Sequence, residues 1–166
     1  MFSFLRVGGA AAIAIAFAGF APSTIAQEST SVQTCQPVWS SAPEPLGDRE
    51  GHAILVSQGS CRIESGPLSG GVLTDVSIWE FDGAKAVRLT ESGIIRKSDA
   101  VVVINGTGGN FALTMADGKV TGWTASGRDN YLMATGSAAP LAGKSFTWTA
   151  KPTGPAGQLT VEAKDE

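Results

Sequence analysis

The sequence of 166 residues is poor in the side chains on which most enzyme chemistry depends. It contains one histidine, one tyrosine and two cysteines, and charged residues make up 16% of the chain. A zinc site needs three or four ligands, usually histidine or cysteine, and the acidic residues here show no ligand spacing. No G-x-S-x-G motif occurs, and Ser60-Cys61 has no histidine signature nearby. The sequence therefore predicts no metal site and no cofactor.

Basic clusters are equally scarce. The chain has 12 Lys and Arg against 15 Asp and Glu, which gives a net charge of −3. A nucleic acid or an anionic lipid surface needs a basic face, and only small clusters such as Arg96-Lys97 are present. We expect no nucleic-acid partner. Beyond the N-terminus no apolar stretch is long enough to cross a bilayer, so we expect no membrane span in the mature chain.

The N-terminus carries the one long apolar run. Arg6 is the only charge before Glu28, residues 7–21 are apolar, and Thr24-Ile25-Ala26 offers the small residues that signal peptidase reads. This pattern predicts a cleaved secretory signal peptide over residues 1–26 and an exported protein, periplasmic or secreted. The alternative is a membrane anchor, but the run is short for a span of roughly 20 residues and no basic cluster follows it.

The two cysteines are consistent with export. Cys35 and Cys61 are an even number of cysteines in an exported chain, which favours one disulfide. A redox pair usually has closer spacing, and a metal site needs more ligands than this chain offers. We expect the disulfide to tie residues 27–50, a Ser-, Thr-, Gln- and Pro-rich extended arm, to a domain over residues 51–166.

Glycine, in contrast, is abundant, and it stands where β-hairpins turn. Residues 111–124 alternate apolar and small side chains on both sides of Asp117-Gly118. That dipeptide suits a two-residue type I′ turn, because both central residues need positive φ. The turn predicts that Phe111 faces Thr124. A second hairpin is predicted around Asp82-Gly83.

About eight to nine strands with short links, and no helix, are expected between residues 51 and 166. This spacing predicts an all-β fold, a single antiparallel up-and-down β-barrel of about eight strands. Such a barrel is just wide enough for one small ligand or for its own side chains. The segment NGTGGN, residues 105–110, is expected to be a loop, because it lacks the Lys-Ser/Thr pair and the helix of a phosphate-binding loop.

The order GTGGNF followed by SGRDNYLMATGSAAPLAG resembles the small eight-stranded barrels of the allene-oxide-cyclase and dirigent type. In those families a G-x-G-x-F-like strand start and an A-T-G-S/T-like segment recur late in the domain. The likeness covers roughly residues 106–150. It implies a calycin-like barrel that binds a small hydrophobic or phenolic molecule. The catalytic residues of those enzymes have no matching motif here, so none is carried over.

The hairpin around Asp82-Gly83 has two different faces. One is aliphatic and ends in a Glu80–Lys85 surface pair, and the other carries charge and aromatic rings, namely Asp75, Trp79, Phe81 and Arg88. If the second face looks into the barrel, its rings wall a pocket in which Arg88 binds a carboxylate. Alternatively the aliphatic face is the core and Arg88 is solvated. The pattern alone favours this alternative.

Three functions fit these observations, and the sequence does not decide whether the chain is an enzyme. The first is an exported barrel that binds a small, mainly apolar ligand, with Arg88 as a polar handle and walls drawn from Trp79, Phe81, Phe111, Trp123 and Trp148. The second is an isomerase or lyase that uses the same cavity. Its acid–base candidates are His52, Asp75 and Glu91. The third is an envelope interaction protein with a solid core and a partner surface on residues 27–50.

Overall fold

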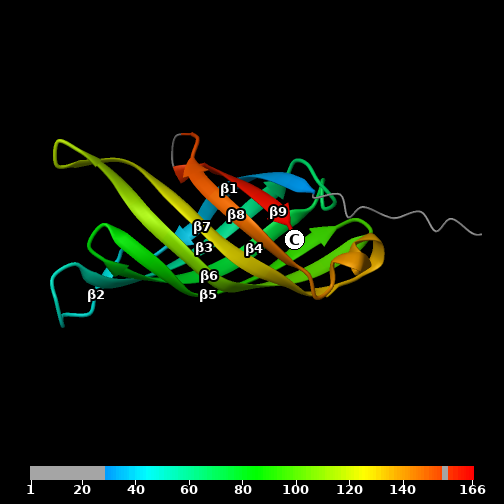
Figure 1. Ribbon diagram of the computed structural model, residues 1–166, viewed down its shortest axis with the longest axis horizontal. Helices are drawn as coiled ribbons and strands as arrows, with labels where there is room; N and C mark the ends of the chain where they lie inside the picture. The colour runs from blue at the N-terminus through cyan, green and yellow to red at the C-terminus, as the bar shows by residue number, and fades with distance from the viewer. Residues whose placement is uncertain (1–28, 155–156) are drawn as a thin grey trace, which may run out of the picture.

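The computed structural model describes residues 29–154 and 157–166 (Figure 1). The predicted signal peptide, residues 1–26, lies outside the described residues. The described chain forms nine strands and one short 3₁₀ helix. They are β1 (Thr30–Ser40), β2 (Glu44–Pro45), β3 (His52–Ile63), β4 (Val72–Asp82), β5 (Lys85–Lys97), β6 (Ala100–Ala116), β7 (Lys119–Ala134), η1 (Gly136–Leu141), β8 (Ser145–Pro152) and β9 (Leu159–Asp165).

Eight of these strands close into an antiparallel barrel. From β3 to β9 each strand pairs with the next in sequence, β9 pairs with β1, and β1 pairs with β3, while β2 adds a short edge to β3. The predicted all-β, up-and-down barrel of about eight strands is therefore confirmed. Its strand number and connectivity are compatible with a calycin-like barrel. None of the helices among the described residues is long and apolar enough to cross a membrane.

The first strand belongs to the barrel and is not an arm. β1 pairs with β3 from Gln33 to Ser40 and with β9 from Thr30 to Cys35. The prediction of an extended arm is therefore wrong for residues 30–40, and the barrel begins before residue 51. β1 has few large apolar side chains of its own. It is held in place by backbone hydrogen bonds to the strands on both sides. Without it, β3 and β9 would both be unpaired edges.

The predicted disulfide is present and joins β1 to β3. Cys35 and Cys61 are direct cross-strand partners, with their Cα atoms 3.9 Å apart, and they are joined by a disulfide bond. Both residues are buried in the core. The bond therefore fixes the register of β1 against β3 across the intervening residues 41–51.

The turn at Asp117-Gly118 follows the predicted chemistry, but the register beyond it does not. Asp117 and Gly118 have φ angles of 50° and 72°, as a type I′ turn requires. A bulge between Thr114 and Met115 in the pairing of β6 with β7 then shifts the register, so Phe111 faces Ala125. The prediction that Phe111 faces Thr124 is therefore wrong.

In the β4–β5 hairpin the turn itself lies one residue later than predicted. Its turn residues are Gly83 and Ala84, because Asp82 pairs with Lys85. Glu80 consequently faces Val87, and its carboxylate contacts His52 and Arg49 instead of Lys85. The predicted Glu80–Lys85 pair is wrong.

One end of the barrel is filled with side chains. η1 and the loop of residues 64–71 cover this end, and their apolar residues Leu68, Ala138 and Leu141 are buried there. Figure 1 shows η1 at one end of the long axis and the β4–β5 and β6–β7 hairpins at the other. The adjoining core includes Ile63, Val102 and Ile104, each at most 1% exposed. Any internal space must therefore lie toward the hairpin end.

Replacement of both cysteines with serine tests how much the disulfide between β1 and β3 stabilises the barrel. We expect the Cys35→Ser/Cys61→Ser variant to lose about 3–4 kcal/mol in its free energy of unfolding, because the bond closes a 26-residue loop. Urea unfolding of the oxidised wild type and the variant measures the loss. Reduction of the wild type should reproduce the variant's midpoint. Equal midpoints for oxidised wild type and variant would contradict this account.

Candidate functional site

The barrel contains a partly open cavity of about 290 Å³ toward the hairpin end. Four of the five predicted ligand-binding residues line it, namely Trp79, Phe81, Trp123 and Trp148, and Phe111 lines it as well. The Phe111 ring stacks on Trp123 at 5.4 Å and meets Phe81 edge-on at 5.4 Å. It also meets Trp79 at 6.2 Å. These contacts fix the rings as one apolar wall.

Arg88 lies inside the barrel, so the aliphatic face of the β4–β5 hairpin is the outer one. The Arg88 side chain is 1% exposed, whereas Val87 and Leu89 are 47% and 54% exposed. The interpretation that the pattern alone favoured is therefore wrong. A bulge at Leu89 explains the arrangement, because Trp79 pairs with Arg88 while the preceding Ile78 pairs with Thr90.

The Arg88 guanidinium is held by several acceptors. Nη1 donates to the Glu91 carboxylate, and Nη2 donates to the Asp129 carboxylate. Nη2 also donates to the carbonyl oxygens of Gly108 at 2.7 Å and Arg128 at 3.2 Å. The Trp148 ring lies 4.9 Å from the guanidinium carbon. These contacts offset the cost of removing a cation from water.

Three carboxyls, from Asp75, Glu91 and Asp129, line the cavity around this single arginine. Burial raises the pKa of all three, and burial together with the charge of Asp129 raises the pKa of Glu91 to about 8. One guanidinium balances one carboxylate. Glu91 is therefore held largely in its protonated form at neutral pH.

Glycines in the strands make room for these polar side chains. Asp75 pairs with Gly59 on one side and Gly93 on the other, and a Cβ atom at Gly59 would lie 2.7 Å from its Oδ1. A Cβ atom at Gly106 would lie 2.8 Å from the Arg88 Cζ. Residues 105–110 are thus part of strand β6, and the prediction of a loop there is wrong.

The three acid–base candidates lie in two different parts of the molecule. Asp75 and Glu91 line the cavity, but His52 does not. His52 Nδ1 lies 2.5 Å from Asp48 and Nε2 lies 2.7 Å from Glu80. These two hydrogen bonds, with the one to Asp48 the stronger cause, raise the pKa of His52. Its position indicates that it holds the loop before β3 against β4.

Asp129 was missed by the sequence reasoning. It is 2% exposed and follows the alternation of inward side chains at Ala125, Gly127 and Tyr131 along β7. That period of two would have placed it inside, but only if residues 119–134 were recognised as one strand. Arg88, by contrast, was identified, yet it is not among the lining residues, because Trp148 and the two acids surround it.

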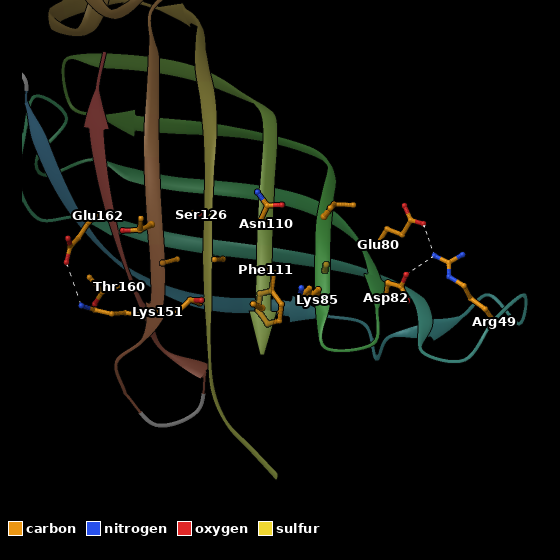
Figure 2. Close-up of a pocket in the computed structure, with 17 residues that line it drawn as sticks. Arg49, Glu80, Asp82, Lys85, Asn110, Phe111, Ser126, Lys151, Thr160 and Glu162 are labelled. Atoms are coloured by element: carbon orange, nitrogen blue, oxygen red, sulfur yellow. Dashed lines mark ion pairs between the residues drawn. The ribbon is translucent and has the colours of Figure 1, made fainter. Parts of the chain in front are cut away.

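A second hollow of about 730 Å³ lies along β4 to β9 and shares Phe111, Ala125 and Ala150 with the inner cavity (Figure 2). Arg49 reaches Asp82 at 3.5 Å at one side of it, and Lys151 reaches Glu162 at 3.9 Å at the other. The side chains of these two ion pairs are exposed. We place the candidate site in the smaller inner cavity, where buried polar atoms remain without partners.

Within the described residues no group of three or more His, Cys, Asp or Glu side chains is arranged to hold a metal ion. Comparison with known proteins finds no family model and no curated protein that matches the chain. Function must therefore be argued from the cavity itself.

A pair of glycine variants on β7 tests the packing around Trp148. A Cβ atom at Gly127 would lie 2.5 Å from the Gly108 carbonyl oxygen and 2.6 Å from Trp148 Cζ2, whereas at Gly122 its nearest neighbour would be 4.0 Å away. We expect Gly127→Ala to lose about 1–3 kcal/mol of unfolding free energy. Gly122→Ala should change it by less than about 0.5 kcal/mol. Denaturant unfolding compares them, and equal losses would refute the close packing.

The raised pKa of Glu91 predicts a pH dependence of stability. Its usual value is 4.5 and its folded value is about 8, so the folded chain binds an extra proton between them. The stabilising contribution is complete below pH 4.5 and is lost as the pH rises toward 8. The free energy of unfolding should therefore fall over this window, by up to about 1.4 kcal/mol per pH unit for each such proton.

Glu91→Gln should flatten part of that slope, whereas Glu162→Gln, an exposed control, should retain it. Urea unfolding at several pH values between about 5 and 8 gives the slopes. The slope is compared instead of the absolute stability, because the glutamine also weakens a contact to Arg88. An unchanged slope in Glu91→Gln would show that this carboxyl is ionised throughout.

Proposed function

We propose that this protein is an exported β-barrel that binds a small, mainly apolar molecule in its inner cavity. The observation that carries the proposal is a space of about 290 Å³ with an aromatic wall and a few buried polar groups. Ligand sites typically combine predominantly apolar walls with a small number of placed polar atoms, and this volume is at the lower end of their range. The ligand is therefore about the size of one or two aromatic rings.

The arrangement of the walls supports binding over a purely structural role. A solid core would bring the rings of Trp79, Phe111 and Trp123 into contact with side chains from the opposite strands. Instead, small residues such as Ser57 and Ser77 face the same cavity. The third hypothesis, an interaction protein with a partner surface on residues 27–50, is also less favoured, because much of that segment is strand β1.

An isomerase or lyase remains the second candidate, and one observation favours it. Glu91, with a pKa of about 8, lies in an apolar cavity together with Asp75, and such a carboxyl is suited to proton transfer near neutral pH. In that case Asp75 and Glu91 would share the acid–base work. An activity whose pH profile loses one limb in Glu91→Gln would support this function.

Export is part of the proposal. The buried Cys35–Cys61 disulfide is of the kind that persists in oxidising compartments. The N-terminal pattern of one basic residue, an apolar run and a small-residue site supports the same conclusion.

A cavity-filling variant tests the binding site directly. Ala125 lines the cavity beside Phe111, its cross-strand partner, so Ala125→Leu should occupy ligand space and weaken binding by about tenfold or more. The matched control is Ala116→Leu at the exposed end of β6. Isothermal titration with phenol, indole and 2-naphthylmethanol measures binding. Absence of saturable binding of all three probes, or equal affinity in Ala125→Leu, would contradict the proposal.

A further inference from the structure

We propose that the ligand of the inner cavity is a cation, an aromatic or alicyclic amine whose ammonium group lies against the carboxyls of Asp75, Glu91 and Asp129. This inference rests on the proposed function and adds the chemical class of the ligand to it. It follows from the charge of the side chains that line the cavity, from the aromatic rings among them and from the unpaired Asp75 oxygen.

The lining carries acids and no base. Asp75, Glu91 and Asp129 face the cavity, whereas no Lys, Arg or His is among the residues that line it. Arg88 lies next to the cavity, but both of its amino groups donate to Glu91, Asp129 and backbone carbonyls. An anionic ligand would therefore have to enter beside three acids, and only Nε of the guanidinium is without a partner. A cation would instead stabilise the ionised form of the acids that Arg88 does not balance.

The aromatic wall of the cavity also favours a positively charged ligand. The faces of tryptophan and phenylalanine rings carry negative potential and attract cations within about 6 Å. The protein already uses this effect internally, since the Arg88 guanidinium lies 4.9 Å from the Trp148 ring centre and 6.0 Å from that of Trp79. The stacked Phe111 and Trp123 rings line the same cavity and offer a similar surface to a ligand.

Asp75 supplies an acceptor without a partner. Its Oδ1 is buried and makes no hydrogen bond within the protein. Arg88 Nε and Trp148 Nε1 are also buried without partners, but both are N–H donors and give no support to an ammonium group. Buried polar atoms are rarely left unpaired, so such atoms next to a cavity mark positions for ligand groups. An ammonium N–H is a donor that satisfies Asp75 Oδ1 and neutralises its charge at the same time.

Three probes that share one shape but differ in charge test whether the cavity prefers a cation. They are 2-naphthylmethylammonium, 2-naphthylmethanol and 2-naphthoate, titrated into the full-length mature protein by calorimetry. We expect the ammonium to bind about tenfold or more tightly than the alcohol, and the carboxylate to bind most weakly. Asp75→Asn should remove most of the preference for the ammonium while it retains binding of the alcohol. Glu162→Gln, an exposed acid, should leave all three affinities unchanged.

The pH provides a second readout. Four charged or titratable groups face the ammonium position or pack against it, namely Asp75 from β4, Arg88 and Glu91 from β5, and Asp129 from β7. Because the carboxyls must ionise to pair with a cation, ammonium affinity should rise from about pH 6 to about pH 8, with proton release. The affinity of the alcohol should not rise in the same way.

The outcomes separate this inference from the proposed function. If the alcohol binds as tightly as the ammonium and Ala125→Leu weakens both, the cavity is a ligand site and the charge assignment is overturned. If Asp75→Asn keeps the full preference for the ammonium, the role of Asp75 is overturned. If no probe binds, the proposed function fails and the inference with it. Even if Asp75→Asn lowers the stability of the protein, the affinities of the three probes for the wild type decide which ligand charge the cavity prefers.

Discussion

The burial of Arg88 inside an eight-stranded barrel is the constraint on which the rest of the site depends. A guanidinium that is 1% exposed must be matched by acceptors, and here Glu91, Asp129 and two carbonyl groups supply them. It also needs space, which the glycines of β6 provide, and a strand that turns it inward, which the bulge at Leu89 provides. The cavity, its acids and its aromatic wall are arranged around this one side chain.

Turn chemistry is local, and for that reason the sequence predicted the turn at residues 117–118 correctly, although it placed the β4–β5 turn one residue too early. Asp117-Gly118 requires only its own two backbone conformations, and the hairpin followed. Strand length and register are not local, because bulges at Leu89 and opposite Met115 depend on the neighbouring strand. The segment at residues 105–110 appears loop-like by composition. Gly106 and Gly109 are explained by the Arg88 side chain of β5, which a Cβ atom at either position would meet.

The candidate site was partly predictable for the same reason. The alternation of Trp79, Phe81 and Asp75 on one face held in the structure, since all three line the cavity. Burial of Arg88 could not be deduced from its own hairpin, because its partner Asp129 comes from β7 and its ring partner Trp148 from β8. A buried ion cluster of this kind is recognised only when the topology brings distant strands together.

The most direct test of a hollow, ligand-holding barrel is native mass spectrometry of the mature protein purified from its own host. Our account predicts a mass above that of the bare chain, with the excess released by organic extraction as a small molecule that carries a basic nitrogen. A single mass equal to the chain less the two hydrogens lost in the Cys35–Cys61 bond, under conditions that preserve non-covalent complexes, would contradict it.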